Sequence, residues 1–290
     1  MRKTLKRLSG VRRRGSEAIR DMISGIADYP SLEGSFEDFL NFASELKIRV
    51  LELKCDRLEL LLALSKTNKV FEIKNLLNSF DFRYFVHAPN IDINLASVNL
   101  LLRRASSRIL LKVIDFAAEL DAGVLVSHVG RLSRDYPRKL VRKATKNATD
   151  SLRKINQISD DVGIILTIEN DHKSNDYVLA GHPEQINSLV ENIGCKLTFD
   201  IGHANTIGKI EDFMKLLDKF IVNVHLHDNN GREDGHLPIG KGSINFVEVF
   251  KRMKDWRNEK PLIIECHSYA GIKESIDFMR QELSAQLLHY

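Results

Sequence analysis

Cysteine is scarce in this chain, and its placement argues against a protein held together by disulfides. The three cysteines, Cys55, Cys195 and Cys266, lie far apart and form no CxxC pair. Small secreted domains depend on closely spaced cysteine pairs, whereas isolated thiols are typical of reduced cytosolic proteins. We therefore expect three free thiols in a cytoplasmic protein.

Long apolar runs are also missing. No run approaches the ~20 residues that a transmembrane helix needs. The basic residues 1–14 are not followed by the apolar core of a secretory signal. A membrane-spanning or secreted protein is therefore not expected.

Aromatic residues make up only 7% of the chain, and beyond its basic start no stripe interleaves aromatic with basic residues. Proteins that hold single-stranded or flipped nucleotides combine aromatic side chains with a basic groove. The composition therefore argues against a nucleic acid as the main partner.

The net charge of +4 is unevenly placed, because residues 1–21 hold eight basic residues and only two acidic ones. A basic arm can bind nucleic acid or an anionic membrane, but a solvated extension is the simpler interpretation. No Pro/Gly/Ser-rich linker divides the rest of the 290 residues. We expect a basic, disordered extension at 1–21 and one domain at 22–290.

Eight short apolar runs alternate with longer amphipathic segments along that domain. The runs are rich in Leu and β-branched residues, which is typical of buried parallel strands. The expected strands are 22–27, 49–53, 83–87, 124–128, 164–169, 196–200, 221–226 and 262–265. Eight strand–helix units of roughly 30–35 residues predict an α/β fold, a closed (β/α)₈ TIM barrel, whereas four or five would favour an open sheet.

Amphipathic helices are expected between the strands. Residues 107–120 carry apolar side chains on one stripe with charges opposite. Residues 35–46 begin with Ser35, a favourable N-cap, and Asp38 follows three residues later, where a capping box prefers Glu or Gln.

Side chains that can bind a metal end six of the expected strands. The C-terminal ends of all barrel strands open on the same face, where TIM-barrel active sites lie. A buried carboxylate there needs a cationic partner, because an unpaired buried charge is costly. The candidates are His87, His128, Glu169, Asp200, His225 and Glu265, together with His203, Asp234 and His236 from the following loops.

Imidazole and carboxylate donors together suit zinc, manganese or another divalent first-row metal. No cysteine is among the strand ends, which argues against a thiolate-rich structural zinc site. His227 shares a strand face with His225 by the period-two rule, so it is a candidate for a supporting or substrate contact. His267 stands in the same relation to Glu265.

Several short motifs together resemble the xylose-isomerase-like TIM barrel superfamily. They are HAPNIDINLAS, LVSHVG, TIEN, FDIGHA, HLHDNNGREDGHLPIGKG and IIE, in this order from residue 22 to about the end. The superfamily includes sugar and sugar-phosphate isomerases and epimerases, and the endonuclease IV type of AP endonuclease. The resemblance implies the same barrel and a divalent metal at its mouth.

The two branches imply different ligand sets. In the isomerase and epimerase branch one metal, often Mn, is held by Glu169, Asp200, His225 and Glu265. In the nuclease branch three zinc ions are bound. There His87, His128 and Glu169 hold the first, Glu169, Asp200, His225 and Glu265 the second, and His203, Asp234 and His236 the third.

Two departures from the nuclease pattern favour the isomerase branch. The nuclease family usually has an aromatic residue just after the first His motif, and this chain has Asn90. After its second strand this chain reads LELKCD, where the nuclease branch tends to have a Phe and a Pro/Trp-containing loop.

Our leading hypothesis is a divalent-metal-dependent isomerase or epimerase of a small sugar or sugar phosphate, in which Glu169 and Glu265 transfer the proton. The residues expected to bind substrate are His203, His227, His236 and Lys241, and the amides of Gly240 and Gly242 are expected to approach an anion. The rival is hydrolysis of abasic DNA by three zinc ions, and only under it is DNA a partner. A non-catalytic sensor and a homo-oligomer both stay open.

Overall fold

The computed structural model describes residues 25–253 and 260–287. The expected extension at 1–21 lies outside the described residues, as do the first three residues of the first expected strand.

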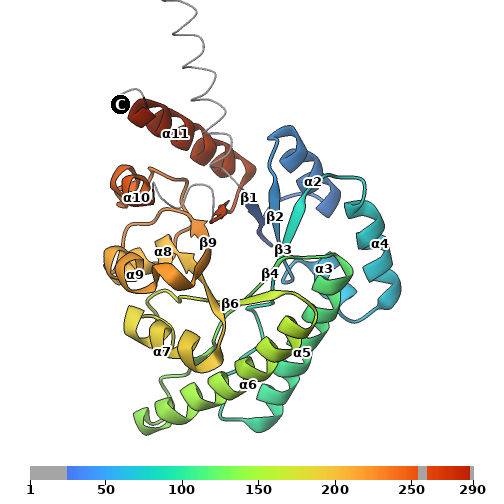
Figure 1. Ribbon diagram of the computed structural model, residues 1–290, viewed down its shortest axis with the longest axis vertical. Coiled ribbons are helices and arrows are strands. Elements are labelled where there is room, and N and C mark those ends of the chain that lie inside the picture. Colours follow the sequence, from blue (N-terminus) through green and yellow to red (C-terminus); the bar gives the residue numbers. More distant parts are fainter. Residues whose placement is uncertain (1–24, 254–259, 288–290) are drawn as a thin grey trace, which may run out of the picture.

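The eight expected strands are all present and close into one parallel barrel, in the order β1-β10-β9-β8-β6-β4-β3-β2. Figure 1 shows them at the centre of the molecule with the helices around them. The strands are β1 Gly25–Asp28, β2 Val50–Lys54, β3 Arg83–His87, β4 Val124–Ser127, β6 Ile165–Glu169, β8 Lys196–Asp200, β9 Ile221–Leu226 and β10 Leu262–Ile264. The TIM-barrel prediction is confirmed.

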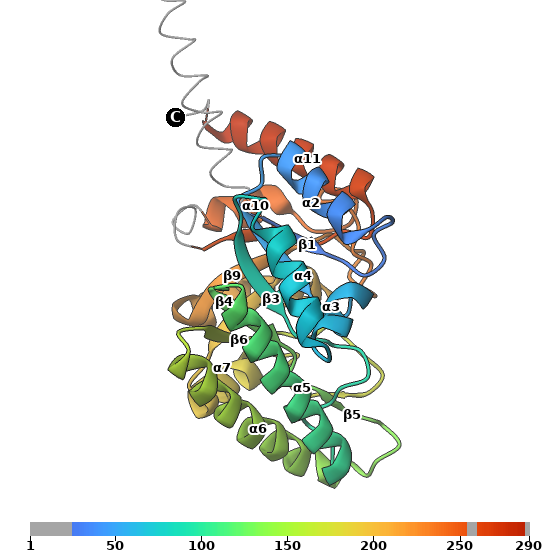
Figure 2. The ribbon, with the colours of Figure 1, turned by 90° about the vertical axis from the view of Figure 1, so that its right-hand side faces the viewer.

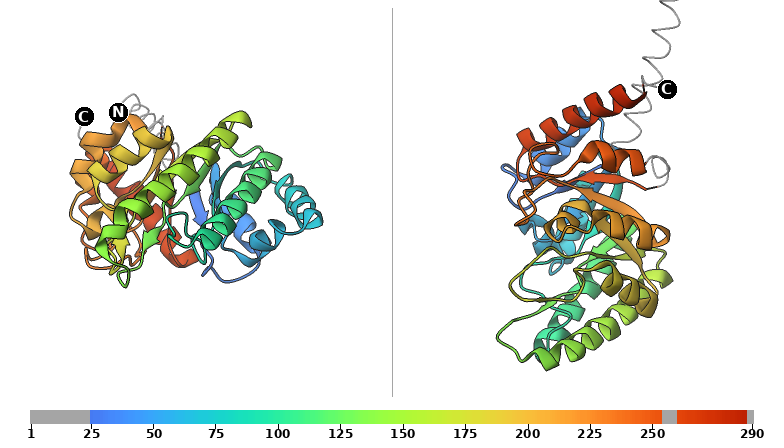
Figure 3. Two further views of the ribbon diagram at one scale, coloured as in Figure 1. Left: turned by 90° about the horizontal axis from the view of Figure 1, so that it is seen from below. Right: turned by 90° about the vertical axis from the view of Figure 1, so that its left-hand side faces the viewer.

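The outer layer is helical. Its helices are α2 Phe36–Glu45, α3 Leu58–Ala63, α4 Thr67–Leu77, α5 Leu100–Glu119, α6 Val141–Asp161, α7 Pro183–Ile193, α8 Ile201–Thr206, α9 Ile210–Leu217, α10 Phe246–Arg252 and α11 Tyr269–Leu287, with single 3₁₀ turns at Arg138–Leu140 and Asp218–Phe220. Helix α2 has the predicted cap, since the Ser35 hydroxyl accepts from the Asp38 amide and Asp38 Oδ2 accepts from the Ser35 amide. Helices α5 and α6 run alongside one another (Figure 3).

The barrel interior changes from apolar to polar towards the strand C-termini. An apolar cluster fills the part of the interior farther from the strand C-termini, and it is formed by Ala27, Val50, Phe85, Val124, Val126 and Ile263. Above it the Thr198 hydroxyl lies 2.7 Å from the Thr167 hydroxyl and donates to Asn223 Oδ1, also at 2.7 Å. Because strand side chains alternate between faces, the next inward residues along β6, β8 and β9 are Glu169, Asp200 and His225.

The first and last elements close the barrel. Strand β1 pairs with β10, and α2 lies beside α11, as Figure 2 shows. The rings of Phe42 in α2 and Tyr269 in α11 are 4.5 Å apart. Among the described residues, no helix is both long and apolar enough to cross a membrane.

A small two-stranded sheet stands outside the barrel, formed by β5 Arg131–Leu132 and β7 Tyr177–Val178, which are antiparallel. It joins the loops that follow β4 and β6. Arg131 Nε donates to Asp171 Oδ2 at 2.8 Å, and Arg131 Nη2 lies 2.7 Å from His172 Nε2. The sheet thus fixes His172 beside His203, with their ring centroids 5.2 Å apart.

Candidate metal centre

The nine metal-competent residues that the sequence predicts meet at one end of the barrel. Four of them lie at or next to the C-terminal end of a strand: His87, Glu169, Asp200 and His225. Two more, His128 and Glu265, directly follow β4 and β10. His203 lies in α8, and Asp234 and His236 come from the loop between β9 and α10. Candidate ligand atoms lie within 4.8 Å of one another in each of four groups of described residues. Three of them are described below, and the fourth joins His225 and Glu265 to Glu52.

The first group is His87, His128 and Glu169. Glu169 Oε2 lies 3.0 Å from His87 Nε2 and 3.2 Å from His128 Nε2. His87 Nδ1 lies 2.7 Å from the carbonyl oxygen of Ala88, so it donates there and leaves Nε2 unprotonated in the neutral ring. Nε2 is therefore available to a metal.

The second group is Glu169, Asp200 and His225, and Glu265 lies directly beside it. His225 Nδ1 is 3.3 Å from Glu169 Oε1, 3.2 Å from Glu265 Oε1 and 3.8 Å from Asp200 Oδ2. All four side chains are almost fully buried. Three carboxylates around one imidazole nitrogen form the most anionic part of the mouth.

The third group is His203, Asp234 and His236, joined by His227. Asp234 Oδ2 lies 3.1 Å from His203 Nε2 and 3.2 Å from His236 Nε2, and Asp234 Oδ1 lies 3.5 Å from His227 Nε2. His203 Nδ1 lies 2.7 Å from the carbonyl oxygen of Asn170 and donates to it, so Nε2 is the nitrogen available to a metal. His203, His227 and His236 thus lie together, as expected for residues of one site.

Protonated histidines offset the negative charge of the buried carboxylates at the mouth. Burial raises the pKa of Glu169, but the charges of His128 and His225 outweigh it and hold this pKa well below its usual range. Burial lowers the pKa of His225, but Glu265, Glu52 and Glu169 together raise it well above the usual value. The pKa of His203 is raised in the same way by Asp200 and Asp234.

The residues present fit a divalent ion. Among the described residues, no hydrogen-bond partner reaches the buried oxygens Asp200 Oδ2 and Asp234 Oδ1. A buried carboxylate oxygen without a partner is costly, and a cation relieves that cost. A metal would replace the histidine protons described above, because ligand imidazoles must be neutral.

Two buried residues of the mouth, Glu52 and Lys54, are not among the predicted site residues. Both lie on β2 and share a face with one another by strand alternation. Glu52 Oε2 lies 3.0 Å from His225 Nε2, and Lys54 Nζ lies 2.7 Å from Glu265 Oε1. The signal was present in the sequence, since two charged residues at alternate positions of the apolar run VLELK imply partners inside the barrel.

Lys241, predicted to bind substrate, does not join the cluster. Its side chain is 62% exposed, and Nζ lies 3.7 Å from Glu274 of α11. The neighbouring amides do approach an anion, but it is the protein's own. Asp228 Oδ2 accepts from the amides of Gly240 at 3.0 Å and Gly242 at 2.8 Å. These amides are therefore engaged within the loop and are not directed at a substrate.

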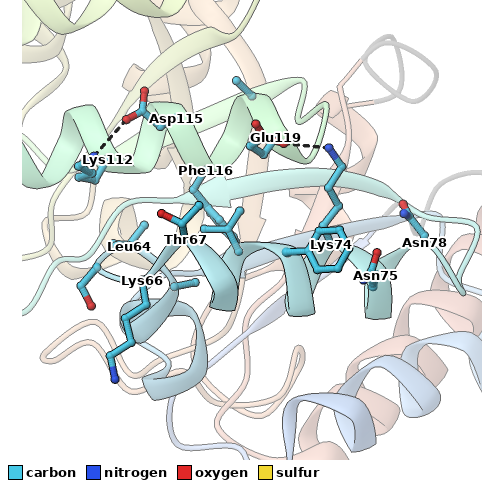
Figure 4. Close-up of a pocket in the computed structure, with 15 residues that line it drawn as sticks. Leu64, Lys66, Thr67, Lys74, Asn75, Asn78, Lys112, Asp115, Phe116 and Glu119 are labelled. Carbon is cyan, nitrogen blue, oxygen red and sulfur yellow. Dashed lines mark hydrogen bonds and ion pairs between the residues drawn. The ribbon is translucent and has the colours of Figure 1, made fainter.

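Two cavities differ sharply in their position. One of about 460 Å³ opens beside Asp234 and is lined also by His172, Lys173, Arg232 and Glu233. A larger one of about 750 Å³ lies between α4 and α5 on the outer layer (Figure 4). Lys74 and Glu119 form an ion pair of 2.9 Å at its rim, and none of the candidate ligands lines it.

A parallel eight-stranded barrel with histidine and carboxylate side chains gathered at its mouth defines a TIM barrel whose residue groups could hold a metal. The family model described as "Xylose isomerase-like TIM barrel" matches residues 40–282. The chain belongs to this family.

Relatives of the chain lie in both branches of the superfamily. An uncharacterised protein of Methanocaldococcus jannaschii is 30% identical over 274 residues, which are 92% of each chain. The solved structure of a "D-tagatose 3-epimerase-like protein" has a TM-score of 0.81 and 30% identity, and the match covers 91% of this chain and 98% of that one. A "Probable endonuclease 4" of Mycobacterium ulcerans is 28% identical over 213 residues, 69% of this chain and 79% of its own.

Proposed function

We propose that this protein is a divalent-metal-dependent isomerase or epimerase of a small sugar or sugar phosphate. One observation carries the proposal: the carboxylates of Glu169 and Glu265 approach the same atom, His225 Nδ1, at 3.3 and 3.2 Å. They come from strands on different sides of the barrel. Two buried carboxylates can therefore face a single substrate carbon from two directions.

The metal would be held by Glu169, Asp200, His225 and Glu265. A divalent ion bound there would supply Lewis-acid chemistry that polarises the substrate carbonyl. Zinc and manganese both accept this mixture of nitrogen and oxygen donors.

The carboxylates move the proton. In isomerisation, one carboxylate takes a proton from the carbon next to the carbonyl and returns it to the former carbonyl carbon, while another proton moves between the two oxygens. In epimerisation, the second carboxylate carries a proton at the start and delivers it to the opposite face of the same carbon, while the first keeps the proton it took. His225 and Lys54 together lower the pKa of Glu265 against the opposing effect of burial, which favours its ionised, proton-accepting form.

The cavity beside Asp234 supports a small polar substrate. Lys173 and Arg232 line it together with Glu233 and Asp234, so both signs of charge face it. At about 460 Å³ it suits a sugar.

A three-zinc AP endonuclease is the second candidate, and one observation favours it. Each of the nine positions implied by the nuclease branch holds a suitable residue, and they gather in matching groups. Against it stands Asn90, which is exposed and whose backbone N–H donates to Asp56 Oδ2 at 2.9 Å. It offers no ring that would stack on a nucleotide.

Deuterium exchange separates the two. The zinc- or manganese-loaded protein is incubated in deuterated water with a panel of keto-sugars and their phosphates, and exchange at carbon is followed by NMR. We expect exchange that is lost in Glu169→Gln and Glu265→Gln. The same preparations are tested for nicking of an oligonucleotide with one abasic site.

His87→Ala decides between the mechanisms. In the proposed enzyme this change impairs substrate binding and leaves one equivalent of the second-group metal bound. Absence of exchange on every sugar, together with abasic-site nicking that His87→Ala abolishes, would overturn the proposal in favour of the nuclease.

A further inference from the structure

His172 lies in the loop after β6 and lines the cavity beside Asp234. Its side chain is 25% exposed, and its ring centroid lies 5.2 Å from that of His203. It belongs to none of the groups of described residues that could hold a metal. The ring therefore lines the cavity next to the candidate metal centre without being one of its candidate ligands.

Arg131 determines how the nitrogens of His172 are used. Its guanidinium forms a two-point pair with Asp171, because Nε donates to Oδ2 at 2.8 Å and Nη2 donates to Oδ1. The second N–H of Nη2 remains for His172 Nε2, which lies 2.7 Å away. A guanidinium has five N–H donors and no acceptor. His172 Nε2 is therefore the acceptor of this hydrogen bond, and it carries no proton.

The proton of the His172 ring is consequently on Nδ1, since a neutral imidazole carries one N–H and one bare nitrogen. Within the described part of the chain, no hydrogen bond engages Nδ1. The ring contacts Arg131 and Asp171 through Nε2, and the backbone N–H donates to Asp171 Oδ1 at 3.0 Å. Because the side chain lines the cavity, Nδ1–H is available to a molecule bound there.

The backbone around His172 is held on both sides. The Asp171 N–H donates to the carbonyl oxygen of Ala180 at 2.8 Å, and the Lys173 N–H donates to Thr206 Oγ1 of α8, also at 2.8 Å. The antiparallel pairing of β5 with β7 holds the neighbouring loops together. A donor that is already fixed loses little conformational freedom when it binds a ligand.

We propose that His172 is a substrate-binding residue, whose Nδ1–H donates to an oxygen of a sugar in the cavity beside Asp234. Arg131 is a positioning residue, because it keeps the ring in the tautomer that makes this donation possible. The inference rests on the proposed function and deepens it, since it assigns a contact that distinguishes one sugar from another.

The expected selectivity follows from the single donor. A hydroxyl oxygen of a sugar accepts from Nδ1–H, whereas a deoxy sugar that lacks this oxygen leaves the N–H without a partner. Sites that are built to donate to a substrate oxygen discriminate strongly against analogues without it. His172 therefore selects for a hydroxyl at one position of the substrate.

The alternative role for His172 is purely structural, with Nε2 serving only to hold Arg131 and the small sheet. Two amide substitutions distinguish the roles. In His172→Asn the amide lies near the position of Nδ1, so the donor to the substrate is kept. In His172→Gln the amide reaches the position of Nε2, so the acceptor for Arg131 is kept and the donor is lost.

The test uses the deuterium-exchange assay on the metal-loaded protein, with the D-keto-pentoses, the D-keto-hexoses and their phosphates as probes. For the probe that exchanges fastest, we expect His172→Leu and His172→Gln to raise KM roughly 3–10-fold, the usual effect of losing one hydrogen bond. The value of kcat should change little, because the contact is the same in ground and transition states. His172→Asn should stay near the native KM.

His182→Asn is the matched control, because His182 is exposed and lies outside the lining of the cavity. It should behave as the native protein does. Rescue by His172→Gln and not by His172→Asn would establish the structural role and overturn the inference. If the native protein exchanges none of the probes, the proposed function and the inference fall together. Native exchange with an unchanged KM in His172→Leu overturns the inference alone.

NMR of the zinc-loaded native protein with ¹⁵N-labelled histidine keeps the test decisive if a variant fails to fold. We expect His172 to carry its proton on Nδ1, and the Nδ1–H signal to move when the probe sugar is added. Arg131→Met should remove the preference for this tautomer and raise KM as His172→Leu does. A proton on Nε2 in the native protein, or an Nδ1–H signal that the bound sugar leaves unmoved, would overturn the inference.

Discussion

Glu52 and His225 form a buried contact across the barrel, with Glu52 Oε2 3.0 Å from His225 Nε2. Because the carboxylate accepts the proton of Nε2, it directs the other nitrogen, Nδ1, to Glu169 and Glu265. Carboxylates behind metal-binding histidines fix the ring and make it a better ligand. The candidate metal centre therefore extends to Glu52, which is grouped with His225 and Glu265.

Glu52→Gln should weaken metal binding. We expect the affinity of the second group for zinc to fall about 10–100-fold, because this is the usual effect of losing such a partner. Competition with a chelator of known affinity measures it. Glu72→Gln is the control, since Glu72 is exposed and pairs with Lys69 on α4. Equal affinities in the two variants would show that Glu52 does not orient His225.

Lys54→Met should impair proton transfer while the metal stays bound. Loss of the cation 2.7 Å from Glu265 removes one cause that lowers the pKa of this carboxyl. The acid limb of the pH–rate profile should therefore move to higher pH, with metal content unchanged. Lys54→Arg should restore most of the native profile. A lower rate with an unmoved acid limb would indicate a purely structural role for Lys54.

The metal-free protein should lose stability as the pH rises. The folded-state pKa values of His203 and His225 are raised above their ordinary value of 6.5. Their stabilising contribution is complete below this unfolded-state pKa and disappears as the pH rises through the folded-state values. Bound metal replaces the protons and adds about 2.7 kcal/mol at a hundred-fold excess over Kd.

Thermal unfolding with chelator and with zinc, in buffers from neutral to alkaline, measures this difference. We expect the two Tm values to diverge with rising pH. Curves that coincide at every pH would argue strongly against a metal in the mouth.

Ser35→Ala should destabilise the fold without affecting the metal. The hydroxyl caps α2, and Ser35 is not among the candidate ligands; loss of such a cap costs about 0.5–2 kcal/mol. Urea unfolding of the metal-loaded protein measures it, with zinc content as the control. An unchanged free energy of unfolding would mean that the Asp38 carboxylate alone stabilises the helix start.

The barrel itself could be predicted from sequence because its signals are local. Eight apolar runs have the length of buried strands, and the pair Ser35 and Asp38 predicts the start of α2. The small elements outside the barrel could not be predicted. Strands β5 and β7 have two residues each, and their pairing depends on loops that are brought together only by the closed barrel.

The candidate ligands could be predicted for a related reason, because they lie at strand ends, which a parallel barrel brings together on one face. Glu52 was missed because it lies in the middle of a strand. The direction of the Lys241 side chain could not be predicted, because a lysine between two glycines has the composition of an anion site, while its direction depends on the packing of the loop on α11. Asp228 satisfies the neighbouring amides, and spacing alone does not reveal this.

The contacts of Asp228 make the loop between β9 and α10 a segment tied at both ends. Its carboxylate accepts from the amides of Gly240, Gly242 and Ile244, and its own backbone pairs with Leu237. The stretch from 230 to 233 thus projects from a fixed frame towards the cavity. Changes of sequence or length there can alter the lining of the cavity without moving Asp234 or His236, so the same framework of candidate ligands can be combined with differently shaped cavities.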